Sequence, residues 1–321
     1  MMKISIAMAT YNGAKYLQDQ LDSFLSQTRL PDELIVCDDL STDDTWDILL
    51  HFSRTVPFKV EVVRNEYNLG YAKNFEKAVS LCTGDIIFLS DQDDVWFDQK
   101  LKTIENIFLS NSEVLVTIND QEITDEFLNA SGNTTYSNTY ALGFDASWFC
   151  AGCCTAFRSE FKDLLLPFPV DLINQDGWIH RLASGLKVRK DVPDVLQYYR
   201  RHSNNSSESM ASSTKKTNKL IPIFRHGLKD ATFGWKNEIS ISKYLIFLTS
   251  NRFEDFEKLN LDAKAVLLNS LEKSRVEALE KRIILLESGR LKRFFGVLKF
   301  YRNGGYDLFS GWRSAVKDLI R

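Results

Sequence analysis

The sequence predicts an α/β protein, with a mostly parallel sheet flanked by helices over residues 1–205 and a helical C-terminal subdomain after it. Two observations predict this division. Up to residue 109, short apolar runs of strand length alternate with segments whose apolar residues recur every three or four positions. Such alternation is typical of βαβ units and a parallel sheet. Beyond residue 219 the helical spacing continues without strand-like runs.

The first eight elements follow in strict alternation. Each expected strand is a run of adjacent apolar residues, and each expected helix carries its apolar residues on one face. The second helix is expected to begin at Ser41 or Thr42, because a hydroxyl at the N-cap is followed there by acidic residues in the first turn. The expected strands are residues 3–8, 33–37, 58–63 and 86–89, and the expected helices are residues 14–27, 41–54, 71–81 and 99–109.

The pattern is mixed between residues 114 and 201. Short apolar runs predict strands at 115–118 and 195–199, and a helix is expected at 176–184. Residues 119–146 are too polar to assign.

A Ser- and Asn-rich stretch with almost no apolar residues separates the two predicted domains. It is typical of a linker or a mobile loop. The predicted division is therefore an α/β domain at 1–205, a linker or mobile loop at 206–218 and a helical subdomain at 219–321.

Composition excludes several classes of protein. The chain has 321 residues with 40 Lys+Arg against 43 Asp+Glu, which gives a net charge of -3 and no general reason to expect a nucleic-acid partner. It has no apolar run of about 18 residues, so a transmembrane helix is not expected. The apolar stretch at the N-terminus is too short for a signal peptide, and we expect a cytoplasmic protein.

Five cysteines, an odd number, agree with a reducing compartment. Cys37 and Cys82 lie inside apolar segments. The formal CxxC of Cys150 and Cys153 has neither a second ligand pair nor a thioredoxin-like context, so a zinc or redox role is not expected.

Polar clusters follow the first, second and fourth expected strands. They are Thr10-Tyr11-Asn12, Asp38-Asp39 and Asp91-Gln92-Asp93-Asp94. Parallel sheets bind ligands beyond the carboxyl ends of their strands, so these clusters are expected to converge on one rim. Asp38 and Asp39 could accept hydrogen bonds from a base or a ribose, whereas Asp43 and Asp44 read as partners of a helix dipole.

The acidic turn after the fourth strand suits a divalent metal ion. Asp91, Asp93 and Asp94 repel one another unless a cation lies between them. Hard oxygen ligands of this kind suit Mg²⁺ or Mn²⁺. The alternative is a solvated turn that caps the following helix. His202 could ligate a metal or contact a diphosphate, although a single histidine is more often structural.

Three further positions are candidates for chemistry. Lys73 lies in the first turn of a helix that Gly70 opens, where a cation can face a phosphate; the alternative is a surface lysine. Asp176, beside Trp178, could be a general base or only a helix N-cap. Arg200 is one of two cations that end the last expected strand.

The order and spacing of these motifs resemble glycosyltransferase family 2, whose members use nucleotide-sugars and have the GT-A fold. The resemblance covers about residues 3–205. The matching segments are ISIAMATYNG (4–13), LSQT (25–28), ELIVCDDLSTD (33–43), NLGYAKN (68–74), GDIIFLSDQDDVW (84–96), DGW (176–178) and YRRHSN (199–204).

The resemblance implies a role for each matching residue. Asp91 and Asp93 look like the DxD pair, of which one contacts the ribose or metal and the other holds a metal that bridges the two phosphates. Asp94 is adjacent and is a further candidate ligand. Asp176 looks like the catalytic base. Thr10, Tyr11, Asn12 and Asp39 look like the nucleotide pocket, with Asp38 shaping it, and Lys73 stands near the diphosphate, where the family often has arginine.

The metal motif together with YRRH (199–202) is similar to that of bacterial rhamnosyltransferases of surface polysaccharide synthesis. This implies dTDP-L-rhamnose as donor and a glycan or lipid-linked glycan as acceptor. Gly177 and Trp178 replace the usual aromatic pair, which implies a smaller wall on the acceptor side. The alternatives are a UDP-hexose or UDP-N-acetylhexosamine transferase, or a nucleotide-sugar-binding scaffold subunit. A dinucleotide oxidoreductase is disfavoured because no G-x-G-x-x-G follows the first strand.

The expected reaction is one displacement with inversion. Asp176 takes the proton of the acceptor hydroxyl as that oxygen attacks the anomeric carbon. A divalent ion, Lys73 and either Arg200 or Arg201 stabilise the leaving diphosphate.

The C-terminal segment 290–321 carries eight Lys/Arg and two Asp, interleaved with aromatic residues. This pattern suits peripheral contact with an anionic membrane at the inner face of the plasma membrane. It equally suits a helical subdomain whose aromatic residues are packed.

Overall fold

The computed structural model describes residues 1–169, 175–203, 205, 209–218 and 231–321. The chain divides into two compact units, residues 1–218 and 219–321. The described part of each unit has its own apolar core.

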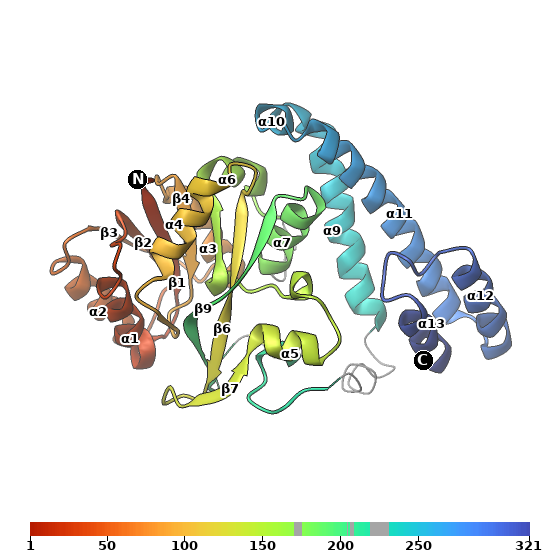
Figure 1. Ribbon diagram of the computed structural model, residues 1–321, viewed down its shortest axis with the longest axis horizontal. Helices are drawn as coiled ribbons and strands as arrows, with labels where there is room; N and C mark the ends of the chain where they lie inside the picture. Colours follow the sequence, from red (N-terminus) through yellow and green to blue (C-terminus); the bar gives the residue numbers. More distant parts are fainter. Residues whose placement is uncertain (170–174, 204, 206–208, 219–230) are drawn as a thin grey trace. The chain divides into compact units, whose positions relative to one another are not determined.

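A nine-stranded mixed sheet crosses the first unit, in the order β3-β2-β1-β4-β8-β6-β9-β5 with β7 paired to β6 (Figure 1). The strands are β1 (Ile4–Thr10), β2 (Glu33–Asp38), β3 (Lys59–Arg64), β4 (Ile86–Ser90), β5 (Val95–Trp96), β6 (Val116–Thr124), β7 (Ala130–Thr134), β8 (Thr155–Arg158) and β9 (Arg189–Arg200). Strands β1 to β4 are parallel, as are β6 and β9, while β5, β7 and β8 pair antiparallel. The predicted α/β class with helices around the sheet is confirmed.

The helices pack their apolar faces on this sheet. In α1, Leu17, Leu21 and Phe24 recur at helical spacing and are fully buried against sheet residues such as Ile6 and Phe88. Burying each such side chain contributes about 1.5–3 kcal/mol. The helices are α1 (Ala14–Leu25), α2 (Thr45–Ser53), α3 (Tyr71–Leu81), α4 (Lys100–Ser110), α5 (Thr135–Ala141), α6 (Ser159–Leu165) and α7 (Gln175–Gly185), with 3₁₀ turns η1 (Ala146–Trp148), η2 (Gly152–Cys154) and η3 (Met210–Ser212).

The start of α2 differs from the prediction. The helix begins at Thr45 rather than at Ser41 or Thr42. The Ser41 hydroxyl instead donates to Asp38, at 2.5 Å, and the amide of Thr42 donates to Asn12 Oδ1. These side chains therefore fix the turn after β2 rather than a helix end.

Strand β6 extends beyond the predicted residues 115–118. The prediction missed its second half because that half is polar and buried. Asn119, Asp120 and Gln121 are all at most 4% exposed. A strand covered on both faces loses the polar–apolar alternation by which a sequence shows it.

Residues 209–218 belong to the first unit and pack against the rest of it. Met210, Ala211 and Ser212 are buried, and the Asn138 side chain of α5 donates to the carbonyl oxygens of Ala211 and Ser213 at 3.0 and 2.9 Å. Of the stretch predicted as a linker or mobile loop, residues 206–208 lie outside the described residues. Its remainder contributes to the unit's surface and to the pocket described below.

The second unit is helical throughout its described part, as predicted. Its helices are α9 (Ala231–Asn251), α10 (Phe253–Lys258), α11 (Asp262–Glu287), α12 (Arg290–Arg302) and α13 (Trp312–Ile320). Its core includes Ala278, Val297, Phe300, Tyr306 and Ala315. Within the ranges given above, no helix is long and apolar enough to cross a membrane.

A buried ion pair joins α11 to α13. Arg282 Nε and Nη2 donate to the Asp318 carboxylate at 2.8 and 3.0 Å, and Tyr306 donates to the same carboxylate at 2.9 Å. Asp318 is fully buried, and the Arg282 guanidinium lies over the ring of Trp235, 4.1 Å from its centroid. Three helices, α9, α11 and α13, and the turn that holds Tyr306 therefore meet at one charge pair.

We expect Asp318→Asn to lower the free energy of unfolding of the second unit by about 3–5 kcal/mol, because it leaves the Arg282 charge buried and unpaired. Urea unfolding of the full chain measures this change. The exposed Asp307→Asn is the matched control, with an expected change of about 0.5 kcal/mol or less. Equal unfolding curves for both variants would contradict the prediction.

Candidate functional site

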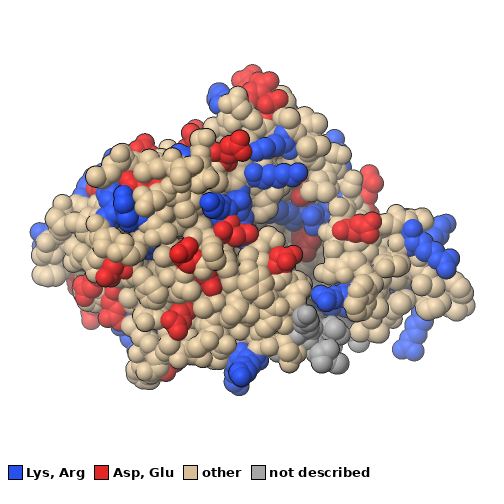
Figure 2. Space-filling view, viewed as in Figure 1, with Lys and Arg blue, Asp and Glu red and all other residues tan. Residues whose placement is uncertain are grey.

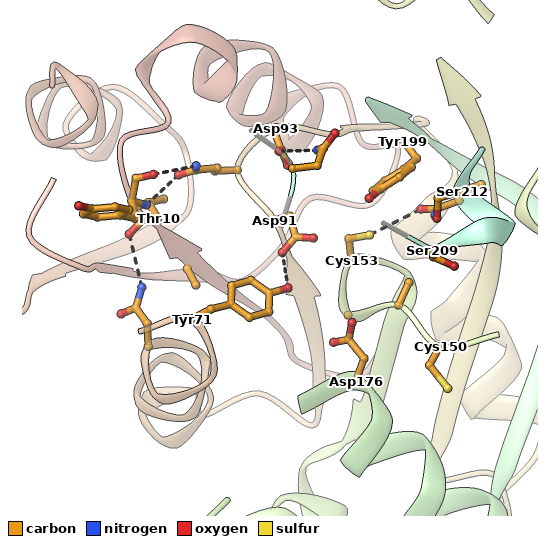
Figure 3. Close-up of a pocket in the computed structure, with 18 of the residues that line it drawn as sticks. Thr10, Tyr71, Asp91, Asp93, Cys150, Cys153, Asp176, Tyr199, Ser209 and Ser212 are labelled. Atoms are coloured by element: carbon orange, nitrogen blue, oxygen red, sulfur yellow. Dashed lines mark hydrogen bonds between the residues drawn. The ribbon is translucent and has the colours of Figure 1, made fainter. Parts of the chain in front are cut away.

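Three parallel strands bring the predicted polar clusters to one edge of the sheet. β1 lies between β2 and β4, with Thr10 paired to Asp38 and Met8 paired to Ser90. The residues that follow these strands therefore lie side by side. A pocket of about 690 Å³ opens there (Figure 3). Its size falls within the usual range for small-ligand sites.

Asp39 orders the loop that leads into α3. Its carboxylate accepts from the amides of Leu69 and Gly70, at 2.7 and 2.9 Å, and from the Asn65 side chain at 2.8 Å. Gly70 has a φ of +80°, a conformation that favours glycine. Asp39 lines the pocket but is only 3% exposed. It therefore forms part of the pocket wall and also holds the Asn68–Gly70 turn in position.

Tyr11 projects at the mouth of the pocket and is 49% exposed. Gln92 clamps the Tyr11 backbone by accepting from its amide at 2.9 Å and donating to its carbonyl oxygen at 3.0 Å. A Cβ atom at Gly13 would lie 2.2 Å from Gln92 Oε1, so only glycine leaves room for this clamp. Sequence reasoning missed Gln92, whose place between two predicted aspartates was the available signal.

The other predicted nucleotide residues lie behind this wall. Thr10 lines the pocket, and its hydroxyl donates to Asp38 at 3.1 Å. Asp38 is fully buried and holds Ser41, so it shapes the turn. Asn12 has a φ of 48° and turns its side chain to Thr42, away from the pocket lining.

Lys73 and Trp178 lie away from the pocket. The Lys73 ammonium is 2.6 Å from Glu76 on the same helix. Trp178 is fully buried, and its indole N–H donates to the carbonyl oxygen of Leu165 at 3.2 Å. Trp178 thus anchors α7 to the end of α6, and the aromatic residues that line the pocket include Trp148 and Phe149 instead.

Asp91 lies at the floor of the pocket, where Tyr71 donates to its carboxylate at 3.1 Å (Figure 3). Burial, followed by the charges of Asp93, Asp94 and Asp176, raises the pKa of Asp91 well above its usual value. A cation placed among carboxylates this close together stabilises their charged forms.

Asp93 faces the strand-end loop that follows β9. Its Oδ2 is 2.8 Å from His202 Nε2 and 3.4 Å from the Asn205 amide. Arg200 is 3% exposed and donates to the Asp93 carbonyl oxygen and, at 2.6 Å, to Asp19. Arg200 therefore holds the acidic turn in place, and His202 contacts the Asp93 carboxylate; neither residue lines the pocket.

Asp94 is buried beneath the pocket in a network of amides. Gln197 donates to one of its oxygens at 3.0 Å and the Arg200 amide to the other at 3.2 Å. Lys100, 1% exposed, donates to Gln197 and to the Cys153 carbonyl oxygen. Burial, followed by the charge of Asp93, raises the pKa of Asp94 to about 7.

Asp176 lies in the first turn of α7 and points into the pocket from the side opposite β1 (Figure 3). Burial raises its pKa to about 6, against the opposing effect of the Gly152 amide. A Cβ atom at Gly152 would lie 2.7 Å from Asp176 Oδ1, so the glycine allows this close approach. Asn204, the last residue of the matching segment 199–204, lies outside the described residues.

Most of the rest of the wall comes from segments without a sequence signal. Gln121 lies on β6, Tyr199 is at the end of β9 within the matching segment 199–204, and Asn205 follows that strand. The other lining residues belong to the segments around η1, η2 and η3: Trp148, Phe149, Cys150, Ala151, Gly152, Cys153, Ser209 and Ser212. The five cysteines are free, and all but Cys150 are buried. Cys150 is exposed and lines the pocket.

Two overlapping groups of side chains offer ligands to a divalent cation, and the first of them brings three ligand atoms together. Asp91, Asp94 and Cys153 have ligand atoms within 4.8 Å of one another. Asp93 Oδ2 and His202 Nε2 lie 2.8 Å apart, and Asp93 is two residues along the chain from Asp91. The oxygens of Asp94 already accept hydrogen bonds from protein groups, and oxygen and imidazole ligands suit Mg²⁺ or Mn²⁺ better than a thiol. By donor chemistry Asp91, Asp93 and His202 suit the ion better, whereas by distance Asp91, Asp94 and Cys153 are the group whose ligand atoms already lie within 4.8 Å of one another.

Comparisons with known proteins agree with this geometry. The family model described as glycosyl transferase family 2 matches residues 5–165. The chain is 36% identical to dTDP-rhamnosyl transferase RfbG of Shigella flexneri, over 66% of this chain and 78% of that protein. It is 28% identical to UDP-Glc:alpha-D-GlcNAc-diphosphoundecaprenol beta-1,3-glucosyltransferase WfaP of Escherichia coli, over 64% and 79%.

Solved structures share the fold. S. aureus TarS in complex with UDP-GlcNAc has a TM-score of 0.55 at 20% identity and covers 94% of this chain and 92% of its own. Mannosyltransferase PcManGT from Pyrobaculum calidifontis, in complex with GDP-Man and Mn2+, has a TM-score of 0.51 at 17% identity, with 99% and 85% covered. The strand-end carboxylates, the matched residues and the shared fold together place this chain in glycosyltransferase family 2, with the GT-A fold, and it is a glycosyltransferase.

Proposed function

We propose that the protein transfers rhamnose from dTDP-L-rhamnose to a glycan or lipid-linked glycan in the synthesis of a surface polysaccharide, with inversion at the anomeric carbon. The similarity to a dTDP-rhamnosyl transferase supports the donor. The observation that carries the reaction class is that Asp91, Asp93 and Asp176 line one pocket at the carboxyl ends of β1, β2 and β4.

In this proposal different residues of the pocket bind the donor and the acceptor. Thr10, Tyr11 and Asp39 line the part of the pocket nearest the ends of β1 and β2, which suits the nucleoside. Asp91, Asp93 and His202 would hold Mg²⁺ or Mn²⁺, which when bound neutralises charge on the leaving diphosphate. Asp94 and Arg200, held in the surrounding network, keep that acidic turn rigid.

Asp176 accepts the proton of the acceptor hydroxyl in this proposal. It lies across the pocket from β1, so an acceptor beside it can attack the face of the sugar opposite the diphosphate. Proton transfer and attack in one step give inversion and require no sugar–enzyme intermediate.

A UDP-glucose donor is the second candidate, because the chain is also similar to a UDP-glucose-dependent transferase. The test is diphosphate release and thermal stabilisation with dTDP-rhamnose, UDP-glucose, UDP-galactose and UDP-N-acetylglucosamine, each with and without Mg²⁺ or Mn²⁺. Metal-dependent stabilisation and turnover selective for dTDP-rhamnose are expected. Preference for a UDP-sugar would discard the rhamnosyl donor, and no response to any donor would favour a scaffold role.

The rate of transfer at saturating donor and metal is expected to rise with pH and level off above about pH 6. Asp176 must be deprotonated to act as a base, and burial raises its pKa to about 6. Below that pH the rate should fall about tenfold per unit. The groups facing it are Asp91, Tyr71 and Cys150. A flat profile between pH 5 and 7.5 would contradict this role.

A further inference from the structure

Helix α12 carries an exposed apolar face. Leu291, Phe294, Phe295, Leu298 and Tyr301 are 75%, 46%, 62%, 36% and 45% exposed. At 3.6 residues per turn these five positions fall on one contiguous arc of the helix. The other side of the helix buries Val297 and Phe300 in the core of the second unit, so the helix is anchored while this arc faces outward.

Cations flank that apolar arc. Arg290, Lys292, Lys299 and Arg302 are all exposed, and α12 contains no acidic residue. Over α12, blue side chains project at the margin of an uncharged surface (Figure 2). The nearest exposed acidic residues in the sequence, Glu287 and Asp307, lie outside the helix. The exposed face of α12 therefore combines apolar bulk with an uncompensated positive charge.

Helix α13 repeats the pattern on a smaller scale. Trp312, Val316 and Ile320 recur every four residues and are 58%, 42% and 62% exposed. The Arg313 guanidinium lies 5.8 Å from the centroid of the Trp312 ring. Ala315 and Asp318 on the same helix are buried, so α13 also presents an apolar stripe away from its core.

We propose that the exposed face of α12, with the stripe of α13 beside it in sequence, docks the protein on an anionic lipid surface. An apolar face of Phe and Leu rimmed by Lys and Arg inserts between acyl chains while its cations contact negative headgroups. A second copy of this chain fits less well, because a symmetric pairing of two such faces brings their cationic rims together. This inference does not depend on which sugar is transferred.

The test is co-sedimentation of the full chain with two kinds of vesicle. One kind contains phosphatidylcholine alone, and the other contains about 30% phosphatidylglycerol as well. Binding to the anionic vesicles only, weakened at high salt, is expected. Lys292→Gln/Lys299→Gln should weaken binding about 25-fold, because each cation near an anionic surface contributes about fivefold. Phe294→Gln/Phe295→Gln should abolish detectable binding, since it removes the inserted aromatic pair.

Matched controls lie on other helices of the same unit. Val266→Gln/Leu267→Gln replaces two exposed apolar residues of α11, and Lys236→Gln/Lys273→Gln removes two exposed cations. Both controls should bind as the parent chain does, and circular dichroism checks that every variant is folded. Equal binding to neutral vesicles, no binding at all, or loss in the controls equal to loss in the α12 variants would each overturn the proposal. So would a dimer in solution that the α12 variants convert to monomers.

Discussion

Asp176→Asn is expected to abolish sugar transfer while leaving donor affinity unchanged. The substitution keeps the size of the side chain and its place beside Gly152 but removes the group that accepts a proton. General base catalysis contributes about 10²–10⁴-fold, so transfer should fall by that factor. The measurement is the rate of dTDP release with a membrane lipid extract as acceptor, together with a calorimetric titration of dTDP.

The exposed Asp194→Asn is the matched control for this experiment, because it makes the same chemical change on β9 outside the pocket lining. Its turnover should equal that of the parent chain. Asp176→Asn with full turnover would remove Asp176 from the reaction. Loss of both turnover and dTDP binding would instead assign it to donor binding.

Asp93→Asn has the second largest expected effect, this time on donor binding. Asp93 lines the pocket and approaches His202 next to Asp91, so it is a proposed ligand of the divalent ion. Such an ion contributes several kcal/mol of charge stabilisation, and each 1.36 kcal/mol is a factor of ten. We expect at least about a 100-fold loss of turnover and the loss of metal-dependent donor binding.

Asp98→Asn is the control for Asp93→Asn, because Asp98 is an exposed carboxylate shortly after the same turn. Titration of dTDP with and without Mn²⁺ separates the two. If Asp93→Asn still bound dTDP more tightly with Mn²⁺ than without it, the ion would have to be held by other residues, of which Asp94 and Cys153 are the structural alternative.

The parallel core of the fold was predictable because its strands are buried runs of apolar residues. The ends of β1, β2 and β4 fall within a residue or two of the predicted positions, so Thr10, Asp39 and Asp91 were correctly expected on one rim. This convergence follows from the parallel arrangement itself, because the crossover connections place the carboxyl ends of all parallel strands at the same edge of the sheet.

The far wall of the pocket could not be predicted from the sequence. Gln121 lies on a strand whose polar residues are buried, and Ser209 and Ser212 lie in a stretch that reads as a linker. Their place is fixed by tertiary contacts such as those of Asn138 with the backbone of 211 and 213. Local sequence patterns carry no trace of such contacts.

The directions in which individual side chains point could not be predicted from the sequence either. Lys73 occupies the expected helical turn but pairs with Glu76, and Trp178 is adjacent to Gly177 in the motif but faces the core. Position along a helix is set by spacing, whereas the group that a side chain meets depends on which face the helix turns to the sheet.

Anomalous X-ray scattering from Mn²⁺ in crystals grown with dTDP tests the central claim most directly. The ion is predicted beside Asp91, Asp93 and His202, with the diphosphate in the same pocket and Asp176 across from it. An ion held by Asp94 and Cys153, or a diphosphate bound outside this pocket, would contradict the account.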